Sequence, residues 1–277
     1  GISEDQWVDG AKVVMGWPGG PSSFVSDEVI LQRTKQLREF GVRIVDSPDD
    51  LIGKVDAVML ELQEGSQHLK YAKPFIEDGI PLFIDKPFTC SVLDAKKIVE
   101  LARSRSVPIF SSSSLRYALE VQKLRSRRDL GEIYGAETYS PAHLHPKNPG
   151  LFNYGIHGIE MLYAIMGTGC KSVRCIHDER WDVVVGVWHD GRTGLFRGIR
   201  KGALGYGFTA FCEKAIVSSS IDTRYIYREL LKKVVEMFQT RKMPIDPEET
   251  IEIIAFIEAS LKSANNGSVE CPINVDC

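Results

Sequence analysis

One candidate for chemistry is Asp85-Lys86-Pro87, which directly follows the apolar residues Phe83 and Ile84. In open α/β sheets, ligands bind at the carboxyl ends of the strands, so this lysine would stand at a binding edge. Partial burial would lower the pKa of its amine toward the range in which an amine exchanges protons. The alternative is a surface ion pair between Asp85 and Lys86 at the end of a strand.

Asn153 and His157 form a second candidate, because a spacing of four residues places both side chains on one face of a helix. Gly155 and Gly158 flank the histidine, and we expect their lack of side chains to let a ligand approach closely. In that setting His157 could orient a ligand or share a proton. The structural alternative is a histidine that only completes hydrogen bonds within the core.

Further polar residues are predicted at the same edge. The serine run 111–114 leaves an expected strand and leads to Arg116 and Tyr117, which could contact a substrate. His143 and His145 have the spacing of paired metal ligands, but they lie in a proline-rich loop without a clear carboxylate partner. We therefore expect no metal site.

The elements that would position these residues begin with alternating strands and helices. We expect strands at 12–17, 42–45, 57–62, 81–85 and 107–111, with helices at 27–40, 66–78 and 91–105. Strands that are nearly continuous apolar runs, separated by helices, predict βαβ units and a parallel sheet covered on both faces.

After about residue 130 the pattern changes to a meander. We expect strands at 133–141, 172–177, 182–188, 193–199 and 207–212, a helix that stops at Gly167, and closing helices at 224–241 and 247–266. Asp190-Gly191 is a hairpin turn signal, and alternating apolar residues predict an antiparallel sheet with one covered face. The fold class is thus α/β: a Rossmann-type doubly wound domain at 1–115, then an α+β domain with an open sheet at 116–277.

Composition narrows the function classes. The 277-residue chain has a formal net charge of -3, which does not provide the basic field that nucleic-acid binding needs. Its six cysteines have irregular spacings and form no CxxC pair, so we expect reduced thiols in a cytoplasmic protein. The apolar runs are strand-sized, so we expect no membrane span.

In this order, the motifs resemble those of the Gfo/Idh/MocA oxidoreductases. The matching segments are Val55-Asp56-Ala57-Val58-Met59-Leu60 followed by His68, then Asp85-Lys86-Pro87, Asp129-Leu130-Gly131-Glu132-Ile133, and Asn153 with His157. The resemblance covers nearly the whole chain. It implies a Rossmann domain that binds NAD or NADP, and a second domain that supports the substrate site and often an oligomer interface.

The resemblance also implies roles for single residues. Lys86 and His157 would be catalytic, and Asn153, Arg116 and Tyr117 would bind substrate. The cofactor would contact Trp17, Pro18, Leu60, Glu61, His68, Asp85, Lys86 and Pro87. The expected activity is nicotinamide-dependent oxidation or reduction of a sugar, inositol or related hydroxy compound. The alternatives are elimination or hydrolysis assisted by bound NAD, and a non-catalytic ligand-binding or assembly protein.

The chain departs from the family pattern at four places. Its first strand and glycine-rich turn are missing, and we expect about 20–35 residues before Gly1 to hold them. Gly16-Trp17-Pro18 offers no carboxylate for ribose, which leaves NAD and NADP open. Asp85 replaces a glutamate, and Asn153 replaces an aspartate. Because an amide cannot take a proton, more of the proton transfer would depend on Lys86 and His157.

Overall fold

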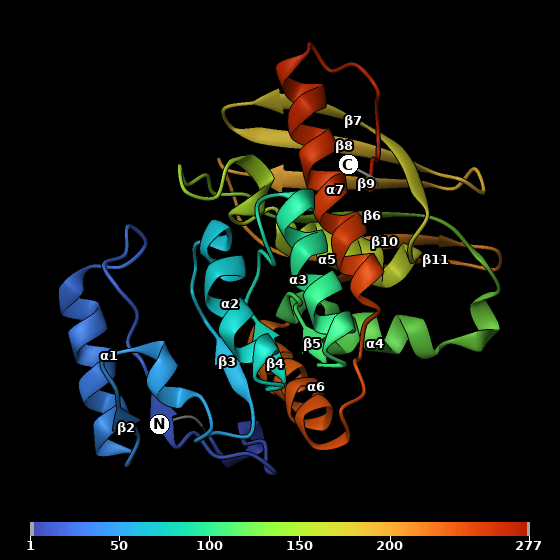
Figure 1. Cartoon of the computed structure of the whole chain (residues 1–277). Coiled ribbons are helices and arrows are strands. Elements are labelled where there is room, and N and C mark those ends of the chain that lie inside the picture. The colour runs from blue at the N-terminus through green and yellow to red at the C-terminus, as the bar shows by residue number, and fades with distance from the viewer. Residues whose placement is uncertain (1–2, 276–277) are drawn as a thin grey trace.

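The computed structural model describes residues 3–275, and its first part is the predicted parallel sheet (Figure 1). Strands β1 (Met15–Gly16) and β2 (Arg43–Ile44) pair with each other, while β3 (Val58–Leu60), β4 (Leu82–Ile84) and β5 (Ile109–Phe110) form a three-stranded sheet in that order. Helices α1 (Asp27–Glu39), α2 (His68–Glu77) and α3 (Val92–Ser104) lie between the strands in sequence. The Rossmann-like fold class is confirmed.

The parallel sheet is divided between β1 and β3, which do not pair within residues 3–275. In a doubly wound sheet of order 3-2-1-4-5-6, the first strand lies between the second and the fourth. The division therefore coincides with the place of the strand that we expect before Gly1. Apolar side chains are exposed beside it, with Val13 59%, Val14 45% and Met59 38% exposed. The upstream strand itself stays a prediction.

Local signals set the ends of the helices. Ser91 caps α3 by accepting a hydrogen bond from the Asp94 amide at 3.3 Å, as its place before the helix predicts. Helix α7 (Pro247–Asn265) begins with a proline, and the Asp246 side chain caps it by accepting from the Glu248 amide. Gly41 follows α1 with a φ of 80°, a conformation that ends a helix without strain in glycine.

A seven-stranded sheet forms the second part, in the order β11-β10-β6-β9-β8-β7-β12. Its strands are β6 (Ile133–Pro141), β7 (Cys170–Asp178), β8 (Trp181–Trp188), β9 (Thr193–Ile199), β10 (Gly207–Cys212), β11 (Ile216–Ser220) and β12 (Cys271–Pro272). All neighbours are antiparallel except β6 and β9. The largely antiparallel sheet is confirmed, whereas β11, β12 and the short helix α4 (Leu119–Ser126) were not predicted.

Helices cover one face of this sheet. Helix α5 (Ile156–Met166) lies against β6 and β9, and α7 crosses β7 (Figure 1). The chain also returns to the parallel sheet, because α6 (Ile226–Thr240) buries Phe83, Phe110 and Tyr117. The two parts therefore share packed elements. The domain boundary between residues 115 and 116 stays a prediction.

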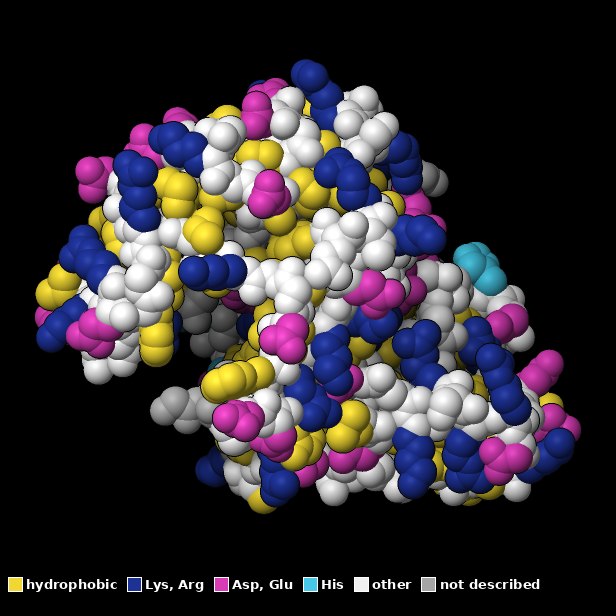
Figure 2. All heavy atoms as spheres, turned by 90° about the horizontal axis from the view of Figure 1, so that it is seen from below, with side chains coloured by type: hydrophobic (Ala, Val, Ile, Leu, Met, Phe, Trp, Pro, Cys, Tyr) yellow, Lys and Arg dark blue, Asp and Glu magenta, His cyan; other side chains and the backbone are white. Residues whose placement is uncertain are grey.

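The other face of the seven-stranded sheet is open and partly apolar. Val185 in β8 pairs with Leu195 in β9, and Val183 pairs with Ile176 in β7; Ile176 is 48% and Val185 36% exposed. Elsewhere on the surface, Figure 2 shows Lys and Arg side chains interspersed with Asp and Glu. Within residues 3–275, no helix has the length and apolar character needed to cross a membrane.

Candidate active site

Lys86 stands at the carboxyl end of β4, where the sequence places it. Leu60 of β3 pairs with Ile84 of β4, and the Asp85 amide donates to the Leu60 carbonyl at 2.9 Å, which fixes the backbone just before the lysine. The half-buried Lys86 donates from Nζ to the Asn153 carbonyl at 3.3 Å. Its Nζ also lies 5.5 Å from the centre of the Tyr154 ring. The sheet edge and the segment before α5 thus meet at this amine.

Burial and a neighbouring carboxylate act in opposite directions on the pKa of Lys86. Burial lowers the pKa of the Lys86 amine, and the Asp85 carboxylate partly opposes this. Burial also raises the pKa of Asp85, against the effect of Lys86. Part of Glu61 is exposed to solvent. Burial of its carboxylate, and then repulsion by Asp85, raise the pKa of Glu61. The result is an amine that loses its proton more readily than a surface lysine.

Helix α5 carries His157 and is held close to the sheet by glycine. A Cβ on Gly158 would lie 2.4 Å from the Phe196 ring and 2.9 Å from Ser140 Oγ, and one on Gly155 would lie 2.7 Å from the Leu151 side chain. The prediction that these glycines admit a ligand is therefore wrong. Their missing side chains instead let α5 pack closely against core residues of the protein, and this packing fixes the position of His157 relative to the sheet.

One ring nitrogen of His157 has a hydrogen-bond partner among residues 3–275. Its Nδ1 lies 2.8 Å from Ser113 Oγ, and its ring packs edge-on against Tyr154 with centroids 4.7 Å apart. Burial, and then the charge of Lys86, lower the pKa of His157 well below its ordinary value. His157 is therefore a neutral imidazole at neutral pH. Ser113 belongs to the serine run that the sequence placed near the cleft.

Aromatic residues that the sequence analysis missed complete the surroundings of Lys86. The Tyr154 hydroxyl lies 3.2 Å from the Tyr206 hydroxyl, and the His143 ring lies 5.3 Å from that of Tyr154. Asn153 donates from Nδ2 to the His143 carbonyl at 2.8 Å. Tyr206 follows Gly205 in the loop before β10, and no spacing in the sequence connects that loop with Lys86.

Arg116 and Tyr117 are not placed as substrate ligands. Arg116 is 3% exposed, and its guanidinium contacts the carboxylates of Glu160 at 3.0 Å and Glu249 at 2.6 Å. Tyr117 is 7% exposed and packs with Phe110 beneath α6. Both predictions of direct substrate contact are corrected on this ground, because buried side chains with these neighbours do not face the cleft. Arg116 instead links α5 to α7.

The first part of the chain resembles known oxidoreductases in sequence. Residues 26–113 match the family model of the Gfo/Idh/MocA oxidoreductases, whose description is an oxidoreductase family with an NAD-binding Rossmann fold. Within residues 26–113 the chain is similar to the Gfo/Idh/MocA oxidoreductases. YhhX, an uncharacterized oxidoreductase of Escherichia coli (strain K12), is 25% identical over 133 residues. That match covers 43% of this chain and 38% of YhhX, so the chain spans about two fifths of that relative.

Solved structures extend the likeness to nearly the whole fold. A myo-inositol dehydrogenase from Corynebacterium glutamicum ATCC 13032 superposes with a TM-score of 0.79 at 14% identity, covering 94% of this chain and 91% of that one. The WlbA dehydrogenase from Bordetella pertussis, in complex with NADH and UDP-GlcNAcA, gives 0.75 at 18% identity over 90% and 89%. At these identities the likeness shows the shared fold.

The edge formed by β3 and β4 carries most of the residues that the sequence predicts to contact NAD or NADP. Leu60 and Glu61 lie beside Asp85, Lys86 and Pro87, because β3 and β4 are paired neighbours, and their contact with a cofactor stays a prediction. Trp17 and exposed Pro18 follow β1 in the separate two-stranded sheet, where Trp17 lies 5.1 Å from the Tyr71 ring.

His68 departs from the role that the family resemblance implies. It is fully buried, with Nδ1 3.0 Å from the Phe88 carbonyl and Nε2 2.6 Å from the Leu62 carbonyl. Direct contact of His68 with a cofactor is therefore corrected. The ring instead joins the loop after β3 to the loop after β4. Burial lowers the pKa of His68, and both carbonyls oppose that effect.

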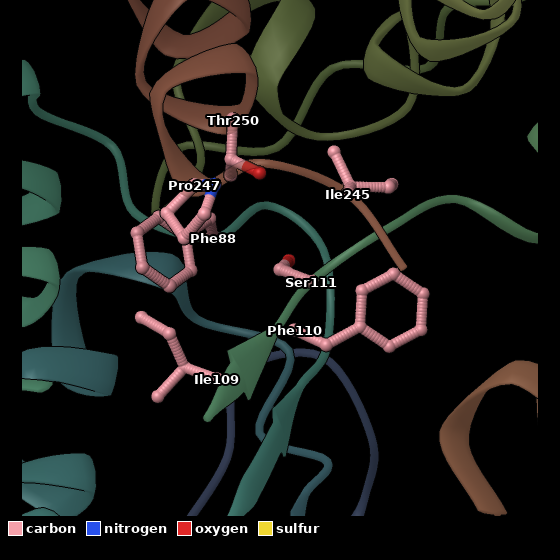
Figure 3. Close-up of a pocket in the computed structure, with 7 residues that line it drawn as sticks. All are labelled: Phe88, Ile109, Phe110, Ser111, Ile245, Pro247 and Thr250. Carbon is pink, nitrogen blue, oxygen red and sulfur yellow. The ribbon is translucent and has the colours of Figure 1, made fainter. Parts of the chain in front are cut away.

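Two cavities lie away from Lys86. One of about 10 Å³ beside Ser111, drawn in Figure 3, has room for about one water molecule, which would serve the otherwise unbonded Ser111 hydroxyl. The other measures about 470 Å³ and lies between the 144–151 loop, β7 and α7. Neither Lys86 nor His157 lines either cavity. Residues 3–275 contain no cluster of His, Cys, Asp or Glu that could hold a metal ion.

Proposed function

We propose that this chain is an NAD- or NADP-dependent dehydrogenase or reductase acting on a sugar, inositol or related hydroxy compound. The observation that carries the proposal is the desolvated Lys86 amine at the end of β4, facing the segment that carries Tyr154 and His157. Such an amine gives up its proton more readily than a surface lysine, which favours proton exchange with a substrate hydroxyl. Bound NAD or NADP supplies the hydride acceptor or donor.

The chain's own residues divide the remaining tasks. In the oxidation direction the substrate carbinol loses a hydride and its hydroxyl proton, and neutral Lys86 takes that proton. The Asn153 carbonyl holds Nζ in place at 3.3 Å, since it accepts a hydrogen bond from the amine. In the reduction direction the ammonium form returns the proton to the carbonyl oxygen. The amide side chain of Asn153 cannot take part in that transfer.

The lining of the site favours a polyhydroxylated substrate. Tyr154 and Tyr206 bring two hydroxyls within 3.2 Å of each other, and the rings of His143 and Tyr154 offer apolar faces beside them. Hydroxyls with aromatic faces suit the mixed polar and CH surface of a sugar or cyclitol. The neighbours with sugar-type names, a myo-inositol dehydrogenase and WlbA with UDP-GlcNAcA, support the same class.

The direct test is a search for hydride transfer. Purified protein is mixed with NAD or NADP and a panel of cyclitols, hexoses and UDP-sugars, and reduced cofactor and oxidised product are quantified. Reduced cofactor equal in amount to the ketone product supports a dehydrogenase. Product formation with no net reduced cofactor would favour elimination or hydrolysis. Absence of both, in protein that binds a dinucleotide, would count against the proposed activity.

We also propose that the open face of the seven-stranded sheet joins copies of the chain. Val185 lies on that face and is 36% exposed, beside Leu195. We expect Val185→Asp to shift the protein to monomer in light scattering, because a carboxylate buried at an interface costs free energy. Val269→Asp is the matched control, since Val269 is 49% exposed outside the sheet. A wild-type protein that is monomeric at micromolar concentration would refute this proposal.

A further inference from the structure

The hydroxyl of Ser113 has a fixed set of partners. It accepts a hydrogen bond from the Leu115 amide at 3.1 Å, since Ser113 caps the 3₁₀ turn Ser114–Tyr117. Its second neighbour is His157 Nδ1 at 2.8 Å. A serine hydroxyl has one hydrogen and two lone pairs, so the hydrogen remains to be assigned. Ser113 is 0% exposed, so bulk solvent does not reach its hydroxyl.

Those partners determine the direction of the hydrogen bond. His157 Nδ1 is the acceptor that the described residues offer to the Ser113 hydrogen. If Nδ1 carried a proton, two hydrogens would face each other or the hydroxyl hydrogen would be buried without an acceptor, which is unfavourable. The hydroxyl therefore donates to Nδ1. A neutral imidazole that accepts at Nδ1 carries its proton at Nε2.

We propose that Ser113 is a positioning residue that holds His157 in the Nε2–H tautomer, so that His157 donates a hydrogen bond to the substrate oxygen and Lys86 alone exchanges the proton. Nε2 lies on the ring edge away from Ser113, and no hydrogen bond from the described residues engages it. The half-buried ring thus keeps its Nε2–H free to donate to a bound ligand. This inference rests on the proposed function only for the substrate oxygen.

The neighbours of His157 agree with a neutral donor. The nearby Lys86 charge disfavours an imidazolium, and Tyr154 contributes an aromatic edge contact and no carboxylate. Asn153 stands one turn before His157 and is neutral. From α5 itself, Glu160 is paired with Arg116 at 3.0 Å. Ser112 precedes the 3₁₀ turn, and its hydroxyl donates to the Ser113 carbonyl at 3.0 Å. A histidine so surrounded has no carboxylate that would make it a base.

The experiment reads the tautomer directly. Protein with ¹⁵N-labelled histidine is studied by two-dimensional NMR, which distinguishes a protonated from an unprotonated ring nitrogen. A His157→Gln variant identifies the His157 signals among the six histidines. We expect the Nε2–H form in the wild type across the neutral pH range. An Nδ1–H tautomer or an imidazolium there would overturn the inference.

Variants of the serine run supply the matched comparison. Ser113→Ala removes the donor, so we expect both tautomers to be populated and kcat to fall by about 2-fold to 10-fold, the range for loss of one hydrogen bond. Ser112→Ala is the control: it removes a neighbouring buried hydroxyl and leaves Ser113 Oγ in place, so the wild-type tautomer should persist. A Ser113→Ala protein with the wild-type tautomer would refute the role of Ser113.

The two proposals can fail separately. An Nε2–H signal in wild-type protein that oxidises none of the polyols tested would leave the tautomer inference intact and count against the proposed function. Turnover of a polyol with an Nδ1–H signal would do the reverse. Circular dichroism of Ser113→Ala checks that the fold is retained, and Ser113→Thr, which keeps a hydroxyl, should restore the tautomer. Loss of the Nε2–H form in folded Ser113→Thr would also contradict the inference.

Discussion

Lys86→Met is expected to lower kcat by about 10²–10⁴-fold, the usual cost of removing a positioned acid or base. Methionine keeps an unbranched apolar stem of similar length, so the packing beside Tyr154 should survive. The other predicted cofactor contacts, such as Glu61 and Pro87, are unchanged, so the Kd of the dinucleotide should stay within a few-fold of the wild-type value. Steady-state kinetics and a cofactor titration measure the two quantities.

The pH profile sharpens that test. Oxidation needs neutral Lys86, so its rate should rise with pH through the lysine pKa, which burial places below the ordinary value. Reduction needs the ammonium form and should show the opposite slope. Both slopes should vanish in Lys86→Met. Lys54→Met is the control, because Lys54 is exposed in a turn between β2 and β3. Near wild-type turnover in Lys86→Met would exclude the proposed mechanism.

Local patterns explain why much of the fold could be predicted. Strand β9 ends where its alternating residues end, at Ile199, and the Ser91 cap and Pro247 start mark α3 and α7. Each of these signals depends on residues within one turn or one strand. Strand β11 was missed because Ile216–Ser220 has three serines in five residues, and its pairing with β10 supplies what its composition does not.

The sequence predicted the central residues of the site, Lys86 and His157, but not the residues that contact them. Lys86 and His157 lie within recognisable motifs, but the Ser113 partner of His157 is 44 residues away in the chain. Tyr206 reaches the site from a loop before β10, and no periodic signal connects it with Tyr154. The prediction for Gly158 was wrong for the same reason. Its neighbour Phe196 belongs to β9, so the sequence alone could not distinguish close packing from space for a ligand.

Arg116 was misjudged for a related reason, since its two carboxylate partners lie on α5 and α7. Arg116→Met is expected to destabilise the protein by about 3–5 kcal/mol, the usual cost of removing one partner from a buried ion pair. Glu160 would then be a buried carboxylate, 3% exposed, without its cation, and Glu249, 18% exposed, would lose the same partner. Urea unfolding followed by circular dichroism measures the change in the free energy of unfolding.

The pH dependence distinguishes this cause from a general loss of packing. Burial already raises the pKa of Glu160, and Arg116 opposes the rise, so removing Arg116 should raise that pKa further. A carboxyl whose pKa is higher folded than unfolded stabilises the fold when protonated and loses that contribution as pH rises through the folded pKa. The deficit of Arg116→Met should therefore be largest at neutral pH and shrink in acid. Adding Glu160→Gln and Glu249→Gln should recover part of the stability, because neutral amides need no cation. A loss of stability that is equal at neutral and acid pH, and that the two glutamine substitutions do not change, would show that Arg116 acts through its packing alone.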